Sequence, residues 1–394
     1  MKSIMFMYHA SNIGGGTYCL LNILKEIDRE KYNPIVLLRS YGDLVEEIKK
    51  LGISVYYMPS MTLVPYNKSL WTRGTVRAYL NIKLSINDFK NIISSLNIDA
   101  VYLNTMMLAP YLKAAKEMGV KTFIHLREHW PLSEHVSQLK RLQSYITKYA
   151  DEILAINSYS ASMVPSRSAT IIYDWIDMSS RYEYMPYEKI IDGYNNTMKV
   201  YLFTGGIQAI KGTCDILNLF RNNIQGGDKR LLILGVDGKP SKNGFKNKLK
   251  YYLSKVGIDS YEYKFWRLVQ RDARVVCMPS NYSVKHIMEQ CYCNLSHFNI
   301  PHANLALAES IIVGAVPVAA ATPESFEYSN NGELAVLYEI NNNNDLLEKL
   351  QYLDENYDEI KNKIRSNSRV IEKMFDKNRN VYKLAEVYDR LLKY

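Results

Sequence analysis

Short apolar segments alternate with longer amphipathic segments along most of this 394-residue chain. The short segments are rich in β-branched and aromatic residues and show little alternation of polar and apolar positions, as is typical of strands covered on both faces. The amphipathic segments between them have helical spacing. Strands that alternate with helices predict a parallel β-sheet with helices on both sides. This pattern limits the fold to the α/β class.

The alternating pattern runs through the chain twice. The first series of expected strands is 3–8, 33–39, 53–59, 99–104, 121–127, 152–157 and 169–174, and the second is 199–206, 230–235, 274–279, 293–298 and 316–321. From Asn344 onward the pattern is helical throughout. Because the chain is longer than one hydrophobic core usually serves, we expect two doubly wound domains. Their expected limits are 1–175 and 198–375, with a linker at 176–197 and a helix at 376–394 that packs back on the first domain.

Three loops lie at the carboxyl ends of expected strands, where doubly wound sheets bind their ligands. The first contains Gly14, Gly15 and Gly16, between the first strand and a helix. A backbone without Cβ atoms can approach a phosphate or a sugar closely, and the following helix offers unpaired N–H groups and the positive end of its dipole. This loop is therefore a candidate for contact with a phosphorylated ligand.

The second loop, TGGIQAIKGTCD at 204–215, places glycines before and after a lysine at the start of a helix. Lys211 can put a positive charge on a phosphate beside the N-terminus of that helix. A surface lysine in a capping turn is the simpler alternative.

The third loop belongs to the segment IPHANLALAESIIVGAVPVAAATPE at 300–324. Asn304 is expected to cap a helix that has Glu309 in its second turn and ends at Gly314. A carboxylate at Glu309 can accept two hydrogen bonds from a ribose diol, while the helix N-terminus holds the attached phosphates.

The first loop also leaves a dinucleotide-binding interpretation open. Cys19 occupies the position of the third glycine in the G-x-G-x-x-G fingerprint, and the second strand ends in Arg39 rather than in an acidic residue. An arginine there is compatible with NADP. An NADP-dependent oxidoreductase is therefore an alternative, although the second wound domain argues against it.

Together the three loops resemble those of the GT-B nucleotide-sugar glycosyltransferases, and among these the retaining enzymes of glycosyltransferase family 4. The glycine loop is similar to that family's N-domain Gly-rich loop, and GGIQAIKG resembles its G-x(4,5)-K-G turn. AESIIVGAVPVAA resembles the EA-x-x-x-G-x-PV segment, which is the most specific match. YSNNGELAVLYEIN and VYDRLL resemble later segments, so the resemblance covers nearly the whole chain. It implies the GT-B fold, with two Rossmann-like domains facing across a cleft and with C-terminal helices.

The resemblance also implies roles for single residues. Lys211 matches the basic residue that neutralises the donor diphosphate, and Glu309 matches the glutamate that binds the nucleotide ribose. His125, in HLREHW, matches a histidine near the reacting centre. The catalytic residues expected are His125, Lys211 and Glu309, and the acceptor contacts are Arg127 and Glu128. The donor contacts expected are Gly14, Gly15, Gly16, Gly205, Gly206, His302, Asn304, Leu305 and Glu309.

Two positions depart from the family pattern. Pro301 replaces the first glutamate of the E-x7-E signature, and Gly206 stands where the family usually has an arginine. The first change removes a carboxylate that would hold the donor sugar, and the second halves the positive charge on the leaving diphosphate. A non-catalytic or weakly active relative that binds sugar nucleotides is therefore a second alternative, and a GT-B sugar epimerase is a third.

The reaction implied by the resemblance is transfer of a sugar, with retention, from a nucleoside diphosphate to a hydroxyl. The acceptor implied is a glycan or lipid-linked glycan in cell-surface polysaccharide synthesis. Lys211 and the helix that begins near Asn304 would stabilise the charge of the leaving diphosphate. No Asp-x-Asp motif is placed to hold a metal. We therefore expect no metal and no cofactor apart from the donor substrate.

The net charge of +9 is unevenly distributed, because Lys and Arg far outnumber Asp and Glu in 51–150 and 201–300. Such regions suit a polyanionic substrate or an anionic membrane face. The basic segment KPSKNGFKNKLKYYLSKVG at 239–257 is either a membrane contact or a solvated helix face. A nucleic-acid partner is not expected, because the chain has neither a basic and aromatic single-strand platform nor a helix-turn-helix pattern.

The expected location is the cytoplasm, with peripheral contact on the inner face of the cell membrane. No apolar run reaches the roughly 18 residues of a membrane-spanning helix, and the N-terminal segment does not resemble a secretion signal. The cysteines are odd in number and scattered, which favours reduced thiols over disulfides or a metal site; they are Cys19, Cys214, Cys277, Cys291 and Cys293.

Overall fold

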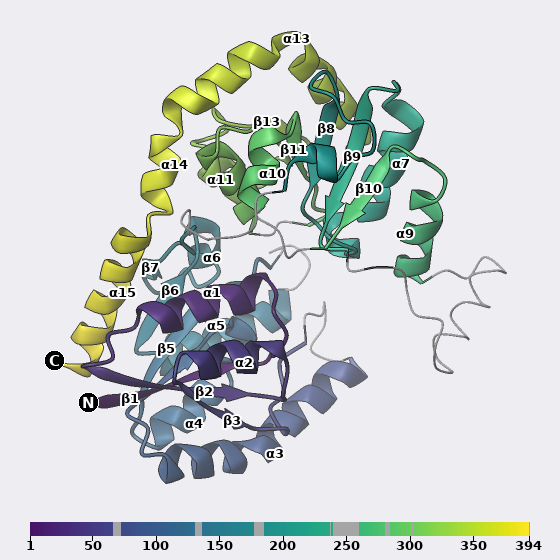
Figure 1. Ribbon diagram of the computed structural model, residues 1–394. Coiled ribbons are helices and arrows are strands. Elements are labelled where there is room, and N and C mark those ends of the chain that lie inside the picture. The colour runs from purple at the N-terminus through teal and green to yellow at the C-terminus, as the bar shows by residue number, and fades with distance from the viewer. Residues whose placement is uncertain are drawn as a thin grey trace. The chain divides into compact units, whose positions relative to one another are not determined.

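The computed structural model describes residues 1–65, 72–130, 136–176, 185–236, 238, 260–279, 284–300 and 303–393. The chain forms two compact units (Figure 1). The first consists of Met1–Ile176 together with Phe375–Tyr394, and the second of Asp177–Met374. Each contains a parallel sheet with helices packed on it, as the alternating sequence pattern predicts.

The sheet of the first unit has seven strands in the order β3-β2-β1-β4-β5-β6-β7. They are β1 (Lys2–Tyr8), β2 (Tyr32–Leu38), β3 (Ser54–Tyr57), β4 (Ala100–Leu103), β5 (Lys121–Leu126), β6 (Glu152–Ala155) and β7 (Thr170–Ile171). Because β1 pairs with both β2 and β4, the direction of winding reverses beside β1. Loops that leave such a switch point diverge and open a ligand-binding crevice at the carboxyl edge of the sheet.

Helices cover both faces of this first sheet. On one face lie α1 (Gly15–Glu26), α2 (Asp43–Lys50) and α15 (Lys377–Leu392), and on the other α3 (Arg73–Ser95), α4 (Tyr111–Glu117) and α5 (Val136–Tyr149). The short elements η1 (Met106–Leu108) and α6 (Ser158–Ser162) complete the unit. Because successive strand residues point to opposite faces, Ile4 and Phe6 of β1 pack toward α1, whereas Met5 and Met7 pack toward α3.

The last helix, α15, is part of the core of the first unit. The ring of Tyr388 packs edge-on against Phe123 of β5, with ring centroids 5.3 Å apart. Asp389 accepts hydrogen bonds from the Tyr32 hydroxyl at 2.5 Å and from Lys31 at 2.9 Å. These contacts fasten α15 to the elements that begin the chain.

The sheet of the second unit has six strands in the order β10-β9-β8-β11-β12-β13. They are β8 (Lys199–Phe203), β9 (Lys229–Leu234), β10 (Val275–Met278), β11 (Cys293–Ser296), β12 (Pro317–Ala320) and β13 (Val336–Tyr338). The helices are η2 (Tyr187–Lys189), η3 (Ala209–Lys211), α7 (Thr213–Asn223), α9 (Tyr261–Val269), α10 (Val284–Gln290), α11 (Leu305–Ile312), α12 (Pro323–Tyr328), α13 (Asn343–Asn367) and α14 (Arg369–Met374). Here β8 lies between β9 and β11, so the winding of this sheet reverses beside β8.

The secondary structure confirms most of the sequence predictions. Every expected strand is present, and the chain from Asn344 onward is helical except for short breaks. The strand β13 was not expected. The basic segment 239–257 lies outside the described residues. All five cysteines are free, and all but Cys277 are buried.

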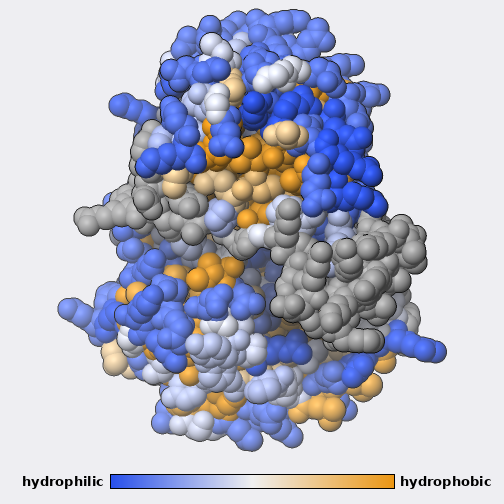
Figure 2. All heavy atoms as spheres, turned by 45° about the vertical axis from the view of Figure 1, so that its right-hand side comes forward, coloured by the Kyte–Doolittle hydropathy of each residue, from blue (hydrophilic) through white to orange (hydrophobic). Residues whose placement is uncertain are grey.

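The surface of the described part of the chain offers no membrane-spanning element. No helix there combines the length and the apolar character that crossing a bilayer requires. On the face shown in Figure 2 most side chains are hydrophilic, and hydrophobic side chains reach the surface in separate patches.

Candidate functional site

In the second unit, two glycines shape the loop that leaves β8. Gly206 has a left-handed backbone (φ +59), and a Cβ there would lie 3.0 Å from the carbonyl oxygen of Gly235. A Cβ on Gly205 would lie 2.2 Å from the ring of Phe203. An arginine at position 206 would therefore need a strained backbone and a shift of the Gly235 turn. The departure from the family pattern at Gly206 has a local structural basis.

Lys211 ends η3, and its loop is fastened to the loop that follows β11. The backbone N–H of Asn299 donates to the carbonyl of Ile210 at 3.1 Å, and its side-chain amide donates to the carbonyl of Ala209 at 3.1 Å. Gly212 then takes a left-handed backbone (φ +57) and opens α7. These contacts hold the Lys211 backbone at the switch point and leave its side chain half-buried.

His297 follows β11 directly and is buried against the same loop. Its Nδ1 lies 2.6 Å from the Tyr338 hydroxyl, and its Nε2 lies 3.1 Å from Oδ1 of Asn299. A Cβ on Gly212 would lie 2.1 Å from the ring, so this close packing requires glycine after Lys211. Burial lowers the pKa of His297, which favours the neutral ring. Neither His297 nor Tyr338 was expected from the sequence.

The helix α11 begins at this edge of the second sheet. As expected, Asn304 caps it, with its side-chain oxygen accepting a hydrogen bond from the N–H of Leu307 at 3.3 Å. The Asn304 side chain is buried, and its Nδ2 has no partner in the described part of the chain. Leu305 is the first helical residue and is half-buried. His302 lies outside the described residues.

Lys211 and Glu309 lie close enough for their charges to interact. Burial raises the pKa of Glu309, and the Lys211 charge opposes this shift. Burial lowers the pKa of Lys211, and the Glu309 charge opposes that shift in turn. Neither side chain forms an ion pair with any residue that the structure describes. Lys211, in the loop after β8, and Glu309, in the helix after β11, are thus within electrostatic range of each other. The donor-binding and catalytic roles expected of both residues stay predictions.

In the first unit, the three glycines of the opening loop form the N-terminus of α1. Gly14 is the N-cap residue, and its N–H donates to the Thr17 hydroxyl at 2.7 Å. A Cβ on Gly16 would lie 2.5 Å from the hydroxyl of Tyr8. A Cβ on Gly15 would meet no atom outside its own helix within 4 Å, and a Cβ on Gly14 would meet only the hydroxyl of Thr17, at 4.0 Å. Packing therefore requires glycine at position 16, whereas Gly14 and Gly15 face open space.

Substitutions at these glycines test this difference. Gly16→Ala is expected to lower the free energy of unfolding by about 1–3 kcal/mol, because the new methyl group displaces the buried Tyr8 side chain. Gly15→Ala, the matched control, adds a methyl group in open space on a helical residue and is expected to stabilise the protein by up to about 1 kcal/mol. Urea unfolding measures both. Equal losses would contradict the close packing of Tyr8 on Gly16.

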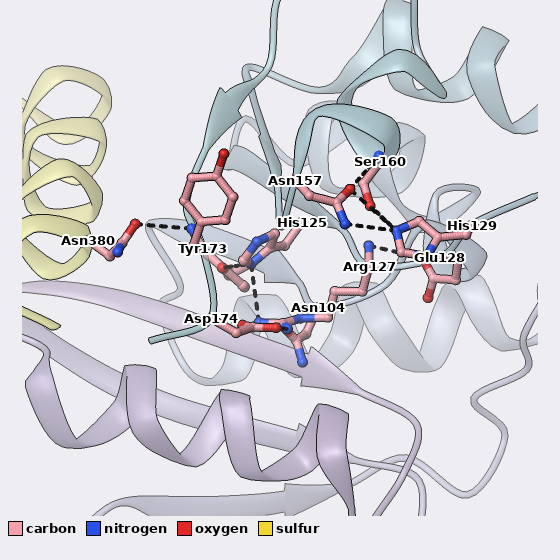
Figure 3. A network of polar contacts seen from close by, with 11 residues as sticks. Asn104, His125, Arg127, Glu128, His129, Asn157, Ser160, Tyr173, Asp174 and Asn380 are labelled. Carbon is pink, nitrogen blue, oxygen red and sulfur yellow. Dashed lines mark hydrogen bonds and ion pairs between the residues drawn. The ribbon is translucent and has the colours of Figure 1, made fainter. Parts of the chain in front are cut away.

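Arg127 follows β5 and lies in a buried polar network at the carboxyl edge of the first sheet (Figure 3). Its Nη1 is 2.8 Å from both carboxylate oxygens of Asp174, and its Nε donates to Oδ1 of Asn104 at 2.7 Å. The side chains of Arg127 and Asp174 are only 7% and 11% exposed. The Arg127 charge is therefore already neutralised, and the expected role of Arg127 as an acceptor contact stays a prediction.

His125 is fully buried within β5 rather than exposed at the edge of the sheet. Its Nδ1 lies 2.6 Å from the Tyr102 hydroxyl and 3.4 Å from Nη2 of Arg127. Burial, together with the Arg127 charge, holds the pKa of His125 well below its ordinary value. Its Nε2 has no partner among the described residues. A catalytic role for His125 requires a ligand to reach this nitrogen.

Glu128 connects the ends of β4 and β5. Its carboxylate accepts hydrogen bonds from the hydroxyl of Thr105 and from the N–H of Met106, the latter at 2.9 Å. Burial raises the pKa of Glu128, and these hydrogen bonds oppose the shift. The expected contact of Glu128 with an acceptor would have to use the remaining lone pairs of this carboxylate.

The helix α15 supports the same network through Asn380. Its Oδ1 accepts a hydrogen bond from the N–H of Tyr173 at 3.0 Å, and its Nδ2 donates to the carbonyl of Asp376 at 2.8 Å. Tyr173 directly precedes Asp174, so α15 fixes the backbone that presents the Asp174 carboxylate to Arg127 (Figure 3). This link was not visible in the sequence.

Comparison with known proteins identifies the fold. No protein-family model matches the chain, and no curated protein matches it in sequence. The structure of HepE from Anabaena in complex with UDP and glucose is similar with a TM-score of 0.73 and 15% identity, covering 99% of this chain and 100% of that one. A glycosyltransferase from Rickettsia africae ESF-5 has a TM-score of 0.66 and 16% identity, covering 100% and 99%.

A third structure, sucrose-phosphate synthase from Thermosynechococcus elongatus, has a TM-score of 0.69 and 10% identity, again covering 100% of this chain and 99% of that one. Each similarity extends over essentially the full length of both chains. The protein therefore has the fold of the GT-B glycosyltransferases, as the sequence resemblance implied.

Proposed function

We propose that this protein is a glycosyltransferase that moves a sugar from a nucleoside diphosphate to a hydroxyl group. The observation that carries the proposal is that Lys211, in the loop after β8, lies within electrostatic range of Glu309 in α11, the helix that follows β11 and is capped by Asn304. A diphosphate needs cationic and N–H partners, and a ribose diol needs an acceptor for its hydroxyl groups. The solved complex of HepE with UDP-glucose, which has this fold, supports a nucleotide sugar as the donor.

In this proposal Lys211 and α11 bind the diphosphate, and Glu309 binds the ribose. Negative charge grows on the diphosphate as its bond to the sugar breaks. A fixed cation and fixed N–H dipoles therefore stabilise the transition state more than the bound donor. The backbone at Gly14 and Gly15, which no packing contact requires to be glycine, approaches a ligand directly in the first unit.

The resemblance to glycosyltransferase family 4 supports finer proposals. The transfer proceeds with retention and without a metal ion, and the acceptor is a cell-surface glycan or its lipid-linked precursor. His125, Arg127 and Glu128 then belong to the reacting centre and the acceptor side. The excess of basic residues in 51–150 supports peripheral contact with an anionic membrane.

The first test is thermal stabilisation by UDP, GDP, dTDP, CMP and NADPH. One nucleoside diphosphate is expected to stabilise the wild-type protein. Glu309→Ala and Glu309→Gln are expected to weaken its binding about 10- to 150-fold, because a hydrogen bond to a charged group contributes about 1.5–3 kcal/mol. Glu348→Ala, which removes an exposed carboxylate from α13, is the matched control and should bind as the wild type does.

The other outcomes of this test select the alternatives. Stabilisation by NADPH alone would replace the proposal with an oxidoreductase. Binding of a nucleoside diphosphate without any sugar transfer would favour the alternative that the protein is a non-catalytic relative. The presence of Gly206, where the family usually has an arginine, is the sequence feature that motivates this alternative. For an active enzyme, the anomeric configuration of the product tests retention, and turnover with EDTA tests metal independence.

A further inference from the structure

The helices α3, α4 and α5 of the first unit enclose a groove of about 560 Å³, which is within the roughly 300–1,000 Å³ of pockets that hold small molecules. The residues that line it come from α3, from α4 with the proline before it, and from α5, and none of them is among those proposed to bind the donor.

The floor and one wall of the groove are apolar. Ile82 and Ala114 are buried beneath it, whereas Val76 and Leu80 of α3 reach the surface. Leu80 is 58% exposed. Exposed apolar side chains that line one concave site, instead of being scattered singly, indicate contact with an apolar ligand.

The rim of the groove is basic. Lys83, Lys113 and Arg141 contribute cations, and Glu117 is the single carboxylate in the lining. Glu117 interacts with Lys113 at 3.7 Å. Among the described residues, Lys83 and Arg141 have no carboxylate within ion-pair distance. The described part of the chain therefore leaves these two positive charges uncompensated.

A buried hydroxyl group adds a polar contact at this rim. The guanidinium of Arg141 lies 4.1 Å from the ring centroid of Tyr79, a cation–π distance. The Tyr79 hydroxyl is buried and has no hydrogen-bond partner among the described residues. Burial raises the pKa of Tyr79 to about 12, so this hydroxyl is a donor at neutral pH. A buried donor without a partner is costly unless a ligand satisfies it.

We propose that this groove binds an anionic lipid of a membrane surface. Its hydrocarbon chain lies between α3 and α4, and its phosphate contacts Arg141, Lys83 and the Tyr79 hydroxyl. An amphiphile with an anionic head satisfies both the apolar floor and the unpaired cations. An amphipathic peptide helix would also fill an apolar groove, but its binding does not require a cation at Arg141, whereas the phosphate of an anionic lipid pairs with that cation. The proposal rests on the peripheral membrane contact proposed above and assigns that contact to this groove, but it does not depend on the donor site proposed in the second unit.

Co-sedimentation with phosphatidylglycerol and phosphatidylcholine vesicles, at low and at high salt, tests the lipid site. The wild-type protein is expected to bind phosphatidylglycerol vesicles, less at high salt, and to bind phosphatidylcholine vesicles far more weakly. Leu80→Ser is expected to weaken binding about tenfold through lost apolar contact. Arg141→Gln is expected to weaken it about fivefold through lost attraction to phosphate.

Two matched variants act as controls. Leu84→Ser removes a leucine of α3 that is 76% exposed but does not line the groove, and Lys140→Gln removes an exposed charge beside Arg141. Both should bind vesicles as the wild type does. The proposal is overturned if the wild-type protein does not bind vesicles, or if it binds phosphatidylglycerol and phosphatidylcholine vesicles equally. It is also overturned if the two control variants lose as much binding as Leu80→Ser and Arg141→Gln. Nucleotide binding by all four variants should be unchanged, so this test and that of the donor site can fail separately.

Discussion

The Asp174→Ala variant is expected to lose about 3–5 kcal/mol of unfolding free energy, with a melting temperature lower by about 10 °C. The substitution leaves the Arg127 guanidinium charged in a site where both side chains are almost fully buried. Such a charge, without an ionic partner and without water, is costly even though Asn104 still accepts one of its hydrogen bonds. Asp174→Asn keeps an acceptor oxygen and is expected to give an intermediate loss. Urea unfolding followed by circular dichroism measures all three proteins.

The matched control for this prediction is Glu152→Ala. Glu152 also forms a two-bond pair with an arginine, because Arg390 donates to its two oxygens at 2.9 and 2.8 Å. Arg390 is 57% exposed, however, so water solvates its charge after the substitution. The expected loss is below about 1 kcal/mol. Equal losses in the Asp174 and Glu152 variants would contradict the importance of burial at Arg127.

The Lys211→Ala variant is expected to reduce kcat about 100- to 1,000-fold, the usual cost of removing one fixed group that stabilises developing charge. The donor for this assay is the sugar nucleotide whose base the thermal-shift test identifies. Binding of the donor should weaken less than turnover falls, because charge on the diphosphate grows toward the transition state. Lys363→Ala, which removes an exposed lysine of α13, should leave turnover unchanged.

A pH profile distinguishes this electrostatic role from a structural one. Burial lowers the pKa of Lys211, so its proton is lost at a lower pH than that of an ordinary lysine. Lys211 is cationic below that pKa and neutral above it, and kcat/KM should therefore fall as the pH rises through it. The alkaline decline should be absent from Lys211→Ala. An unchanged alkaline decline in the variant would assign it to another group.

Periodicity predicted most of the fold, and its failures have physical reasons. The strand β13 contains only Val336–Tyr338, too few residues for a period to be visible. The helix α3 lies between β3 and β4, where the alternating pattern predicts a helix, but its buried face includes Thr75 and Ser85 along with Ile82 and Phe89. Polar residues in the buried stripe obscure the amphipathic pattern, so the ends of this helix were not predicted. In both cases tertiary packing, rather than local sequence, determines the extent of the element.

The candidate site was predictable only in part. Loop glycines and a helix cap are local signals, so the loop that carries Lys211 and the Asn304 cap of α11 could be predicted. The burial of His125 could not, because a histidine near the end of a strand has the same sequence signal whether it points to solvent or into the sheet. The contacts of Arg127 with Asp174, and of His297 with Tyr338, join residues far apart in the chain. Only the order of the strands brings them together.

The position of α15 has a consequence for biosynthesis. The helix covers Tyr32, Tyr102 and Phe123 in the first unit, yet it is translated after the whole of Asp177–Met374. At about 5–20 residues per second, the ribosome needs roughly tens of seconds to make that intervening segment. During this time the nascent first unit exposes an aromatic face that its own chain cannot yet cover. Such an exposed surface is prone to aggregation until α15 has been made and can cover it.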